Sequence, residues 1–324
     1  MPPVLKAPMP YFGKKDKVAP EVWKRFGNVR GYIEPFFGSG AVLLARPHKV
    51  RGIEVANDRD GNIVNFWRAI QANPDAVASW ADWPVTELDR LARHRWLCRE
   101  EDVHAFVEKL VHDPDWYDVK RAGWWVWGVC SSIGGTGTWC HDAVYRGPGD
   151  ERGIKAAGAM SIGGRGVNAF EGNPTLREAS MSIRDRFRRL QERFRFVHIR
   201  CGDWRRCVSD SVARMTKGYI GVFLDPPYSR EVTPMDQVYA GEKEGGDLRG
   251  EVEAWCAEHG KRREYRIAVC GYEGEYKALE KLGWRVYRWT ARGGFANQIG
   301  RNRNKERERI WFSRHCREAV HASP

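Results

Sequence analysis

Residues 34–40 read Glu-Pro-Phe-Phe-Gly-Ser-Gly and connect a short apolar run, residues 31–33, to the apolar helix start Ala41-Val42-Leu43-Leu44. Glycines in a turn from strand to helix let the backbone approach a ligand closely, and the first N–H groups of the helix can bind an anionic group. The pattern therefore favours a nucleotide-like cofactor. On its own it is a weak signal, because many such turns only pack tightly.

Four more apolar runs, each followed by a turn or helix signal, predict an α/β fold with a doubly wound sheet; they cover residues 50–55, 196–199, 220–224 and 266–270. Roughly 140 residues separate the second run from the third, far more than a crossover helix needs, which predicts an inserted domain. Eight of the fifteen tryptophans lie between Trp80 and Trp139, so the composition changes there. Residues 284–291 and 308–313 predict a final antiparallel strand pair.

The second run ends at Asn57-Asp58, where doubly wound sheets commonly present an acidic residue to a ribose. A carboxylate accepts two hydrogen bonds from a vicinal diol, so Asp58 is the candidate ribose ligand. Helix capping ahead of Asp60-Gly61-Asn62 is the alternative role, and the two roles are compatible.

The fourth run leads directly into Asp225-Pro226-Pro227-Tyr228. Proline fixes the backbone and lacks an N–H, so this corner is rigid and rich in hydrogen-bond acceptors. An exocyclic amine carries two N–H donors, which Asp225 and the Pro226 carbonyl would accept while Tyr228 stacks on the attached ring. The alternative is an ordinary turn at the end of a strand.

The chain of 324 residues has 54 Lys and Arg against 42 Asp and Glu, a net charge of +12, and this charge favours a polyanionic partner. Eight cysteines without a C-x-x-C pair argue against a zinc ribbon or a disulfide framework, and no metal site is predicted. No segment has the apolar length to span a bilayer, so we expect a soluble intracellular protein without membrane contact. Basic residues alternate at positions 301, 303, 305, 307 and 309; they either line a groove for a polyanion or keep an edge strand from aggregating.

Taken in order, residues 11–15 (Tyr-Phe-Gly-Lys-Lys), 34–40, 57–58 and 225–228 resemble the D12 class (Dam-like, alpha-group) of N6-adenine-specific DNA methyltransferases. The similarity extends to Gly271-Tyr272 and to the closing hairpin. It implies a class I methyltransferase (Rossmann-like) doubly wound sheet with a C-terminal antiparallel strand pair and an inserted, mainly helical recognition domain. The expected parts are the N-terminal portion of the catalytic domain (1–78), the target-recognition domain (79–190), the C-terminal portion of the catalytic domain (191–317) and a tail (318–324).

The resemblance implies S-adenosyl-L-methionine as cofactor, double-stranded DNA as substrate, and the cytoplasm of a bacterial or phage-infected cell as location. Asp58 would contact the cofactor's ribose, Asp203 would lie beside its adenine, and Asp225 would also contact it. Lys14 occupies the place of a second glycine in the family motif, which puts the shape of that loop in question. The remaining expected cofactor ligands are Tyr11, Phe12, Gly13, Lys14 and Lys15, together with Glu34, Pro35, Phe36, Phe37, Gly38, Ser39 and Gly40 at the methionine end.

The same resemblance assigns catalysis to Asp225, Pro226, Pro227 and Tyr228, acting on an adenine that is flipped out of the duplex. A carboxylate is too weak a base to deprotonate a neutral aromatic amine before attack, so Asp225 is expected to orient the amine. Phosphate contacts are expected from Arg301, Arg303, Lys305 and Arg307. Two alternatives stay open: methylation of cytosine N4, and a catalytically silent DNA-binding protein with the same fold.

Overall fold

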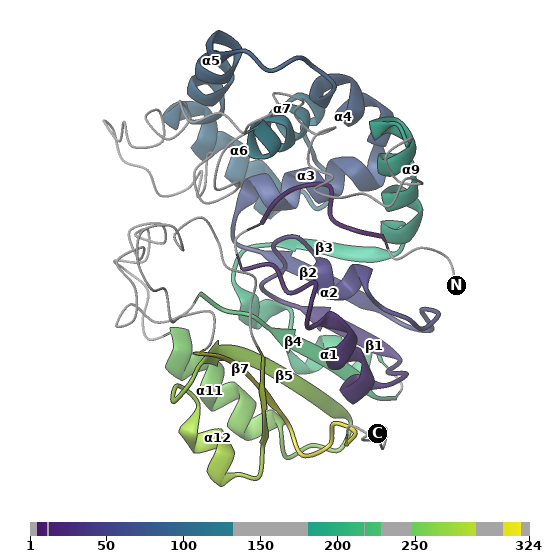
Figure 1. The fold of residues 1–324 in the computed structure, drawn as a ribbon, viewed down its shortest axis with the longest axis vertical. Coiled ribbons are helices and arrows are strands. Elements are labelled where there is room, and N and C mark those ends of the chain that lie inside the picture. The colour runs from purple at the N-terminus through teal and green to yellow at the C-terminus, as the bar shows by residue number, and fades with distance from the viewer. Residues whose placement is uncertain are drawn as a thin grey trace. The chain divides into compact units, whose positions relative to one another are not determined.

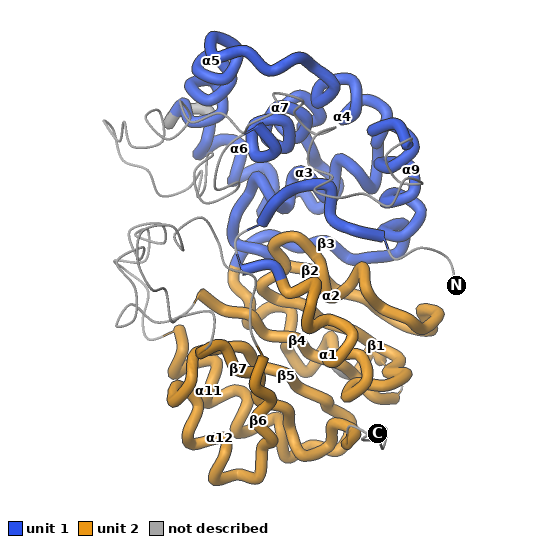
Figure 2. The backbone as a smooth tube through the Cα atoms, viewed as in Figure 1, with its two compact units in different colours: residues 1–14, 58–202 blue, residues 15–57, 203–324 orange. Residues whose placement is uncertain are grey.

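A computed structural model describes residues 5–11, 13–131, 181–216, 218–227, 248–289 and 307–318. Contacts divide the chain into two compact units, each made of two separate stretches (Figure 2). Unit 1 comprises Met1–Lys14 and Asp58–Gly202, and unit 2 comprises Lys15–Asn57 and Asp203–Pro324. The domain boundaries drawn from the sequence remain a prediction.

Unit 2 contains a mixed sheet, whose strands run in the order β2-β1-β4-β5-β7-β6 (Figure 1). The first four are parallel, whereas β7 is antiparallel to both of its neighbours. Every residue of β1, β4 and β7 is buried, as expected for strands covered on both faces. The bounds are β1 Gly31–Glu34, β2 Glu54–Asp58, β4 Ile220–Leu224, β5 Tyr265–Tyr272, β6 Arg285–Arg288 and β7 Glu308–Phe312, and the last residue of β2 is counted with unit 1.

Helices supply the side chains that bury this sheet. On one face, alternate strand residues such as Val222 and Ile267 pack in a core with Trp204, Val252 and Leu279. On the other face, Tyr32 of β1 packs against Trp23 and Phe26 of the first helix. The helices described in unit 2 are α1 Ala19–Phe26, α2 Ala41–Leu44, η3 Trp204–Arg206, α10 Asp210–Arg214, α11 Leu248–His259 and α12 Lys277–Lys281.

Unit 1 is mainly helical and contains β3 (Val197–Cys201) and six described helices. Asp60 caps the first of them by accepting the Asn62 N–H at 2.8 Å. Aromatic packing holds the unit together: the rings of Trp67 and Phe194 stack with centroids 4.4 Å apart. The helices are α3 Gly61–Ala72, α4 Pro74–Ala81, α5 Glu87–Leu97, α6 Glu100–His112, α7 Val119–Ser131 and α9 Ile183–Phe194.

The α/β class predicted from the sequence is confirmed, and each of the five apolar runs overlaps a strand, although β2 shares only residues 54–55 with the run at 50–55. In α9, Arg188 forms an ion pair with Asp75 of α4 at 2.8 Å, and Arg184 donates a hydrogen bond to Ser79 at 3.0 Å. These two side chains therefore join α9 to α4. Within the described ranges, no helix combines the length and the apolar character that a bilayer crossing requires.

Candidate active site

The residues expected to act in catalysis, 225–228, directly follow β4. The strand is buried throughout and ends at Leu224, so the next residue, Asp225, stands at the carboxyl edge of the sheet with its side chain 21% exposed. Pro226 is buried and Pro227 is partly buried. Since neither proline has an N–H, the corner offers a carboxylate and carbonyl oxygens as acceptors. Tyr228 lies outside the described residues.

Lys15 is the partner of this carboxylate. Its Nζ lies 2.8 Å from Oδ2 of Asp225 and 3.8 Å from Oε2 of Glu308, and the side chain is only 5% exposed. Burial disfavours the ammonium, but the nearby carboxylates of Asp225 and Glu308 outweigh it and raise the pKa of Lys15 above the ordinary lysine value. Lys15 is therefore a fixed cation at neutral pH and not a base.

Glu308 and Cys270 belong to this cluster, and the sequence reasoning missed both. Glu308 is the first residue of β7 and pairs in register with Tyr272 of β5. Cys270, two residues earlier in β5, has a pKa raised by burial and by the negative charge of Asp225. The pKa of Tyr272 is raised to about 12, chiefly by burial and then by Glu308. The available signal for Glu308 was an acidic residue at the start of a strand that is otherwise apolar and basic.

Glu34, the first residue of the Gly-rich turn, interacts electrostatically with Asp225. Its buried carboxyl accepts a hydrogen bond from the Tyr32 hydroxyl at 2.8 Å. Burial raises the pKa of Glu34 well above its usual range, and the charge of Asp225 raises it further. Because β1 and β4 are parallel neighbours, Glu34 and Asp225 come from the same edge of the sheet. With Glu308, three carboxyl groups and one ammonium thus share this edge.

The turn itself is shaped by glycine and by backbone hydrogen bonds. Gly40 precedes α2 in the left-handed conformation at φ 65°, and a Cβ there would lie 2.5 Å from Cζ of Phe37. Asn57 fixes the other side: its amide donates to the Pro35 carbonyl at 3.0 Å, and its own carbonyl accepts the Phe37 N–H at 2.9 Å. Gly38 also has a positive φ, 49°, and Ser39 is buried. The turn therefore holds its backbone in one shape at the start of α2.

The two aromatic residues of the turn pack against protein. Phe37 is buried in the core. The ring of Phe36 lies 5.9 Å from that of Trp204, centroid to centroid. This contact brings the segment that contains Asp203 beside the turn, within unit 2.

Asp203 is engaged locally by Arg205. Its carboxylate caps η3 by accepting the Arg205 N–H at 2.9 Å, and both oxygens accept from the Arg205 guanidinium at 3.0 Å. The hydrogen bond from Arg205 lowers the pKa of Asp203. Any ligand of Asp203 therefore shares this carboxylate with an exposed arginine.

Asp58 and the segment around Tyr11 belong to unit 1 and are described within it. Oδ1 of Asp58 accepts the Asp60 N–H at 2.9 Å, so the helix cap itself is Asp60 and Asp58 is the strand-end acceptor before it. Gly13 takes the left-handed conformation at φ 72°, and Lys14 donates its N–H to the Tyr11 carbonyl at 3.4 Å, which closes a turn. Phe12 lies outside the described residues.

Of the basic residues expected to contact a polyanion, only Arg307 is described; Arg301, Arg303 and Lys305 lie outside the described residues. The Arg307 guanidinium lies over the Tyr272 ring at 5.6 Å. Arg309, the next residue in the alternation, is buried and forms an ion pair with Glu273 at 2.9 Å. Arg309 therefore stabilises the β5–β7 pair.

Residues 11–85 match the family model described as D12 class N6 adenine-specific DNA methyltransferase. The resemblance inferred from the sequence motifs is confirmed over this stretch, which includes Tyr11, Lys15, the turn at 34–40 and Asp58. No curated protein matches the chain.

Proposed function

From the match to the D12 methyltransferase family, we propose that the protein transfers the methyl group of S-adenosyl-L-methionine to the N6 atom of adenine in double-stranded DNA, within a specific sequence. The observation that carries the proposal is the 2.8 Å ion pair between Lys15 and Asp225. Lys15 lies in the matched stretch, whereas Asp225 lies far beyond it in the Asp-Pro-Pro-Tyr motif. The ion pair thus joins the two motifs on which the family resemblance rests.

The residues present fit this cofactor. Its methionine end carries an ammonium and a carboxylate, and the cluster offers the carboxyl groups of Glu34 and Asp225 and the ammonium of Lys15. We assign the methionine end to Lys15 and the turn Glu34–Gly40, the ribose to Asp58, and the adenine to Asp203, with Tyr11, Phe12, Gly13 and Lys14 as further contacts. When bound, the cofactor supplies an electrophilic methyl group on a sulfonium.

Asp225 and Pro226 act on the methyl acceptor. The lone pair of an adenine amine is delocalised into the ring, and hydrogen bonds from its two N–H groups to the Asp225 carboxylate and the Pro226 carbonyl favour the form with the lone pair on N6. Lys15 holds Asp225 from its buried side, so the orientation of the carboxylate is fixed before the substrate arrives. After methylation, the cationic amine loses its proton readily, and no strong base is needed.

A base-paired adenine does not expose N6 to such a corner, so the proposal includes a flipped base, with Tyr228 as its stacking surface. Target recognition is assigned to residues 79–190, and phosphate contacts to Arg301, Arg303, Lys305 and Arg307. The enzyme acts where the DNA is, in the cytoplasm of a bacterial or phage-infected cell. Protection of DNA within a restriction-modification system is one role that this activity would serve.

The test is to incubate the purified protein with S-adenosyl-L-methionine and duplex DNA and to identify the modified nucleoside by mass spectrometry. We expect N6-methyladenine. Asp225→Ala is expected to abolish methylation while calorimetry still detects cofactor binding, and Glu318→Ala, a change at a side chain 88% exposed, serves as the matched control. N4-methylcytosine would replace the adenine assignment, absent cofactor binding would identify a silent protein, and an active Asp225→Ala variant would refute the mechanism.

A further inference from the structure

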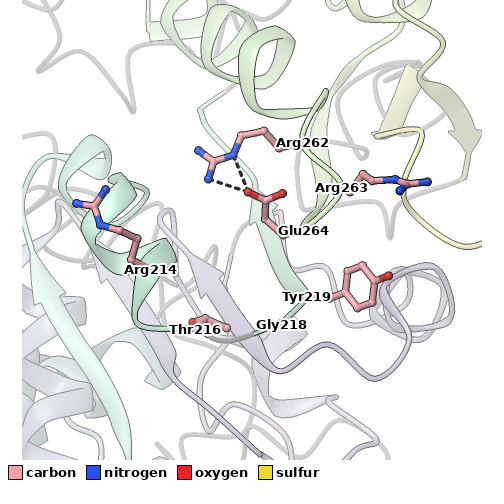
Figure 3. Close-up of a pocket in the computed structure, with 7 residues that line it drawn as sticks. All are labelled: Arg214, Thr216, Gly218, Tyr219, Arg262, Arg263 and Glu264. Carbon is pink, nitrogen blue, oxygen red and sulfur yellow. Dashed lines mark hydrogen bonds and ion pairs between the residues drawn. The ribbon is translucent and has the colours of Figure 1, made fainter.

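A pocket of about 430 Å³ lies in unit 2 at the edge of the sheet opposite Asp225. It is formed at the amino-terminal ends of β4 and β5, whose first residues, Ile220 and Tyr265, are paired in register. One wall comes from the segment between α10 and β4, and the other from the turn before β5 (Figure 3). The lining residues are Arg214, Thr216, Gly218, Tyr219, Arg262, Arg263 and Glu264.

The pocket has more positive charge than its carboxylates neutralise. Arg262 is compensated, since it contacts Asp210 and Glu264 at 2.7 Å each. Arg214 and Arg263 form no hydrogen bond or ion pair with the described part of the chain. Arg30 adds another exposed cation beside the pocket, because a Cβ on Gly218 would lie 3.5 Å from its side chain. An anionic ligand would find the Arg263 guanidinium without a carboxylate partner among the described residues, whereas the charge of Arg214 already acts on Asp210.

A polar group in the wall also lacks a partner. Thr216 is only 8% exposed, and its hydroxyl has no hydrogen-bond partner within the described ranges. This hydroxyl is turned toward β1, because a Cβ on Gly31 would lie 2.8 Å from its oxygen. The neighbouring Tyr219, 49% exposed, is held in place by the Arg266 guanidinium 4.2 Å from its ring centroid.

We propose that this pocket is a phosphate-binding site, in which Arg214 and Arg263 contact the anionic oxygens. Figure 3 shows Arg214 on one side of the pocket and Arg263 on the other, with their guanidinium groups pointing away from each other, so contact with both would take a ligand with more than one phosphate group. Such phosphates occur in a free polyphosphate and along a DNA strand. The site goes beyond methyl transfer, because it lies at the edge of the sheet away from Lys15 and Asp225.

Calorimetry with inorganic pyrophosphate, and fluorescence anisotropy with a labelled DNA duplex, test the proposal with the full chain. Pyrophosphate has no base, so it does not compete for an adenine pocket. We expect Arg214→Gln and Arg263→Gln each to weaken binding about tenfold, because each removes a charged hydrogen-bond donor. Lys281→Gln, which removes an exposed charge from α12, is the control and should leave binding unchanged.

If the arginine variants lose affinity only for pyrophosphate, the ligand is a free polyphosphate. If they lose affinity only for the duplex, the ligand is the DNA backbone. If both pocket arginine variants bind both probes as the Lys281→Gln control does, the site does not exist as proposed. Neither readout requires methyl transfer. If the protein methylates DNA but the pocket variants bind both probes unchanged, only this inference is overturned. If the protein does not methylate DNA but the pocket variants lose affinity, only the proposed function is overturned.

Discussion

Replacing Lys15 with methionine removes the buried ammonium that lies 2.8 Å from Asp225 and 3.8 Å from Glu308. At an effective dielectric constant of about 20, these distances correspond to Coulomb attractions of about 6 and about 4 kcal/mol. Desolvation of the lysine opposes much of this attraction, and removing one partner of a buried pair generally costs about 3–5 kcal/mol. We therefore expect Lys15→Met to lower the free energy of unfolding by about 3–5 kcal/mol, measured by urea denaturation with tryptophan fluorescence.

A triple variant separates the charge effect from packing. Adding Asp225→Asn and Glu308→Gln to Lys15→Met leaves no uncompensated charge in the cluster, so the triple variant should be more stable than the single one by about 1–2 kcal/mol or more. The reasoning is refuted if Lys15→Met unfolds within about 1 kcal/mol of the unmodified protein, or if the triple variant regains no stability.

The pH dependence of the same comparison follows from the pKa of Lys15, which is higher in the folded protein than the ordinary lysine value. Stability from such a group is fully present below its unfolded pKa, about 10.4, and is lost as the pH rises toward the folded pKa. The stability difference between the unmodified protein and Lys15→Met should therefore stay constant near neutral pH and shrink above about pH 10.4. A difference that is independent of pH up to 11 would contradict the assigned ion pair.

Two further changes test the local geometry by urea denaturation. Gly40→Ala should destabilise the protein by about 2–4 kcal/mol, because it adds left-handed strain to a Cβ contact of 2.5 Å with Phe37. The control is Gly283→Ala, which is also at positive φ but has nothing within 4 Å and should cost only about 1 kcal/mol. Equal losses of stability in the two variants would argue against the close contact. Asp60→Ala should cost about 1 kcal/mol through loss of the hydrogen bond to the Asn62 N–H, and an unchanged midpoint would show that α3 does not depend on this cap.

Local patterns predicted local structure well. The strand, turn and helix around Glu34 and Gly40 follow from an apolar run, glycines and a second apolar run, and they appear as β1 and α2. The acceptor-rich corner at Asp225 follows in the same way from a buried strand that ends in two prolines. In both places, residues adjacent in the sequence are enough to predict the local structure.

Contacts between residues that are far apart in the sequence could not be predicted from such local patterns. Lys15 was expected to meet the cofactor, but its contact with Asp225 and Glu308 depends on which strands become neighbours in the sheet, and hydrophobic periodicity does not encode strand order. The choice of the residue that caps α3 was a smaller difficulty. Asp58 and Asp60 both precede the helix and both can act as caps, and only the backbone conformation selects Asp60.

The position of β7 between β5 and β6 has a consequence for biosynthesis. A ribosome makes Lys15 about 290 residues before Glu308, yet the two side chains lie 3.8 Å apart once β7 has paired with β5. Nascent chains that have not yet received the last strand therefore lack one wall of the charge cluster, and contacts so far apart in sequence form slowly. The charge cluster is consequently complete only after β7 has been synthesised and has paired with β5.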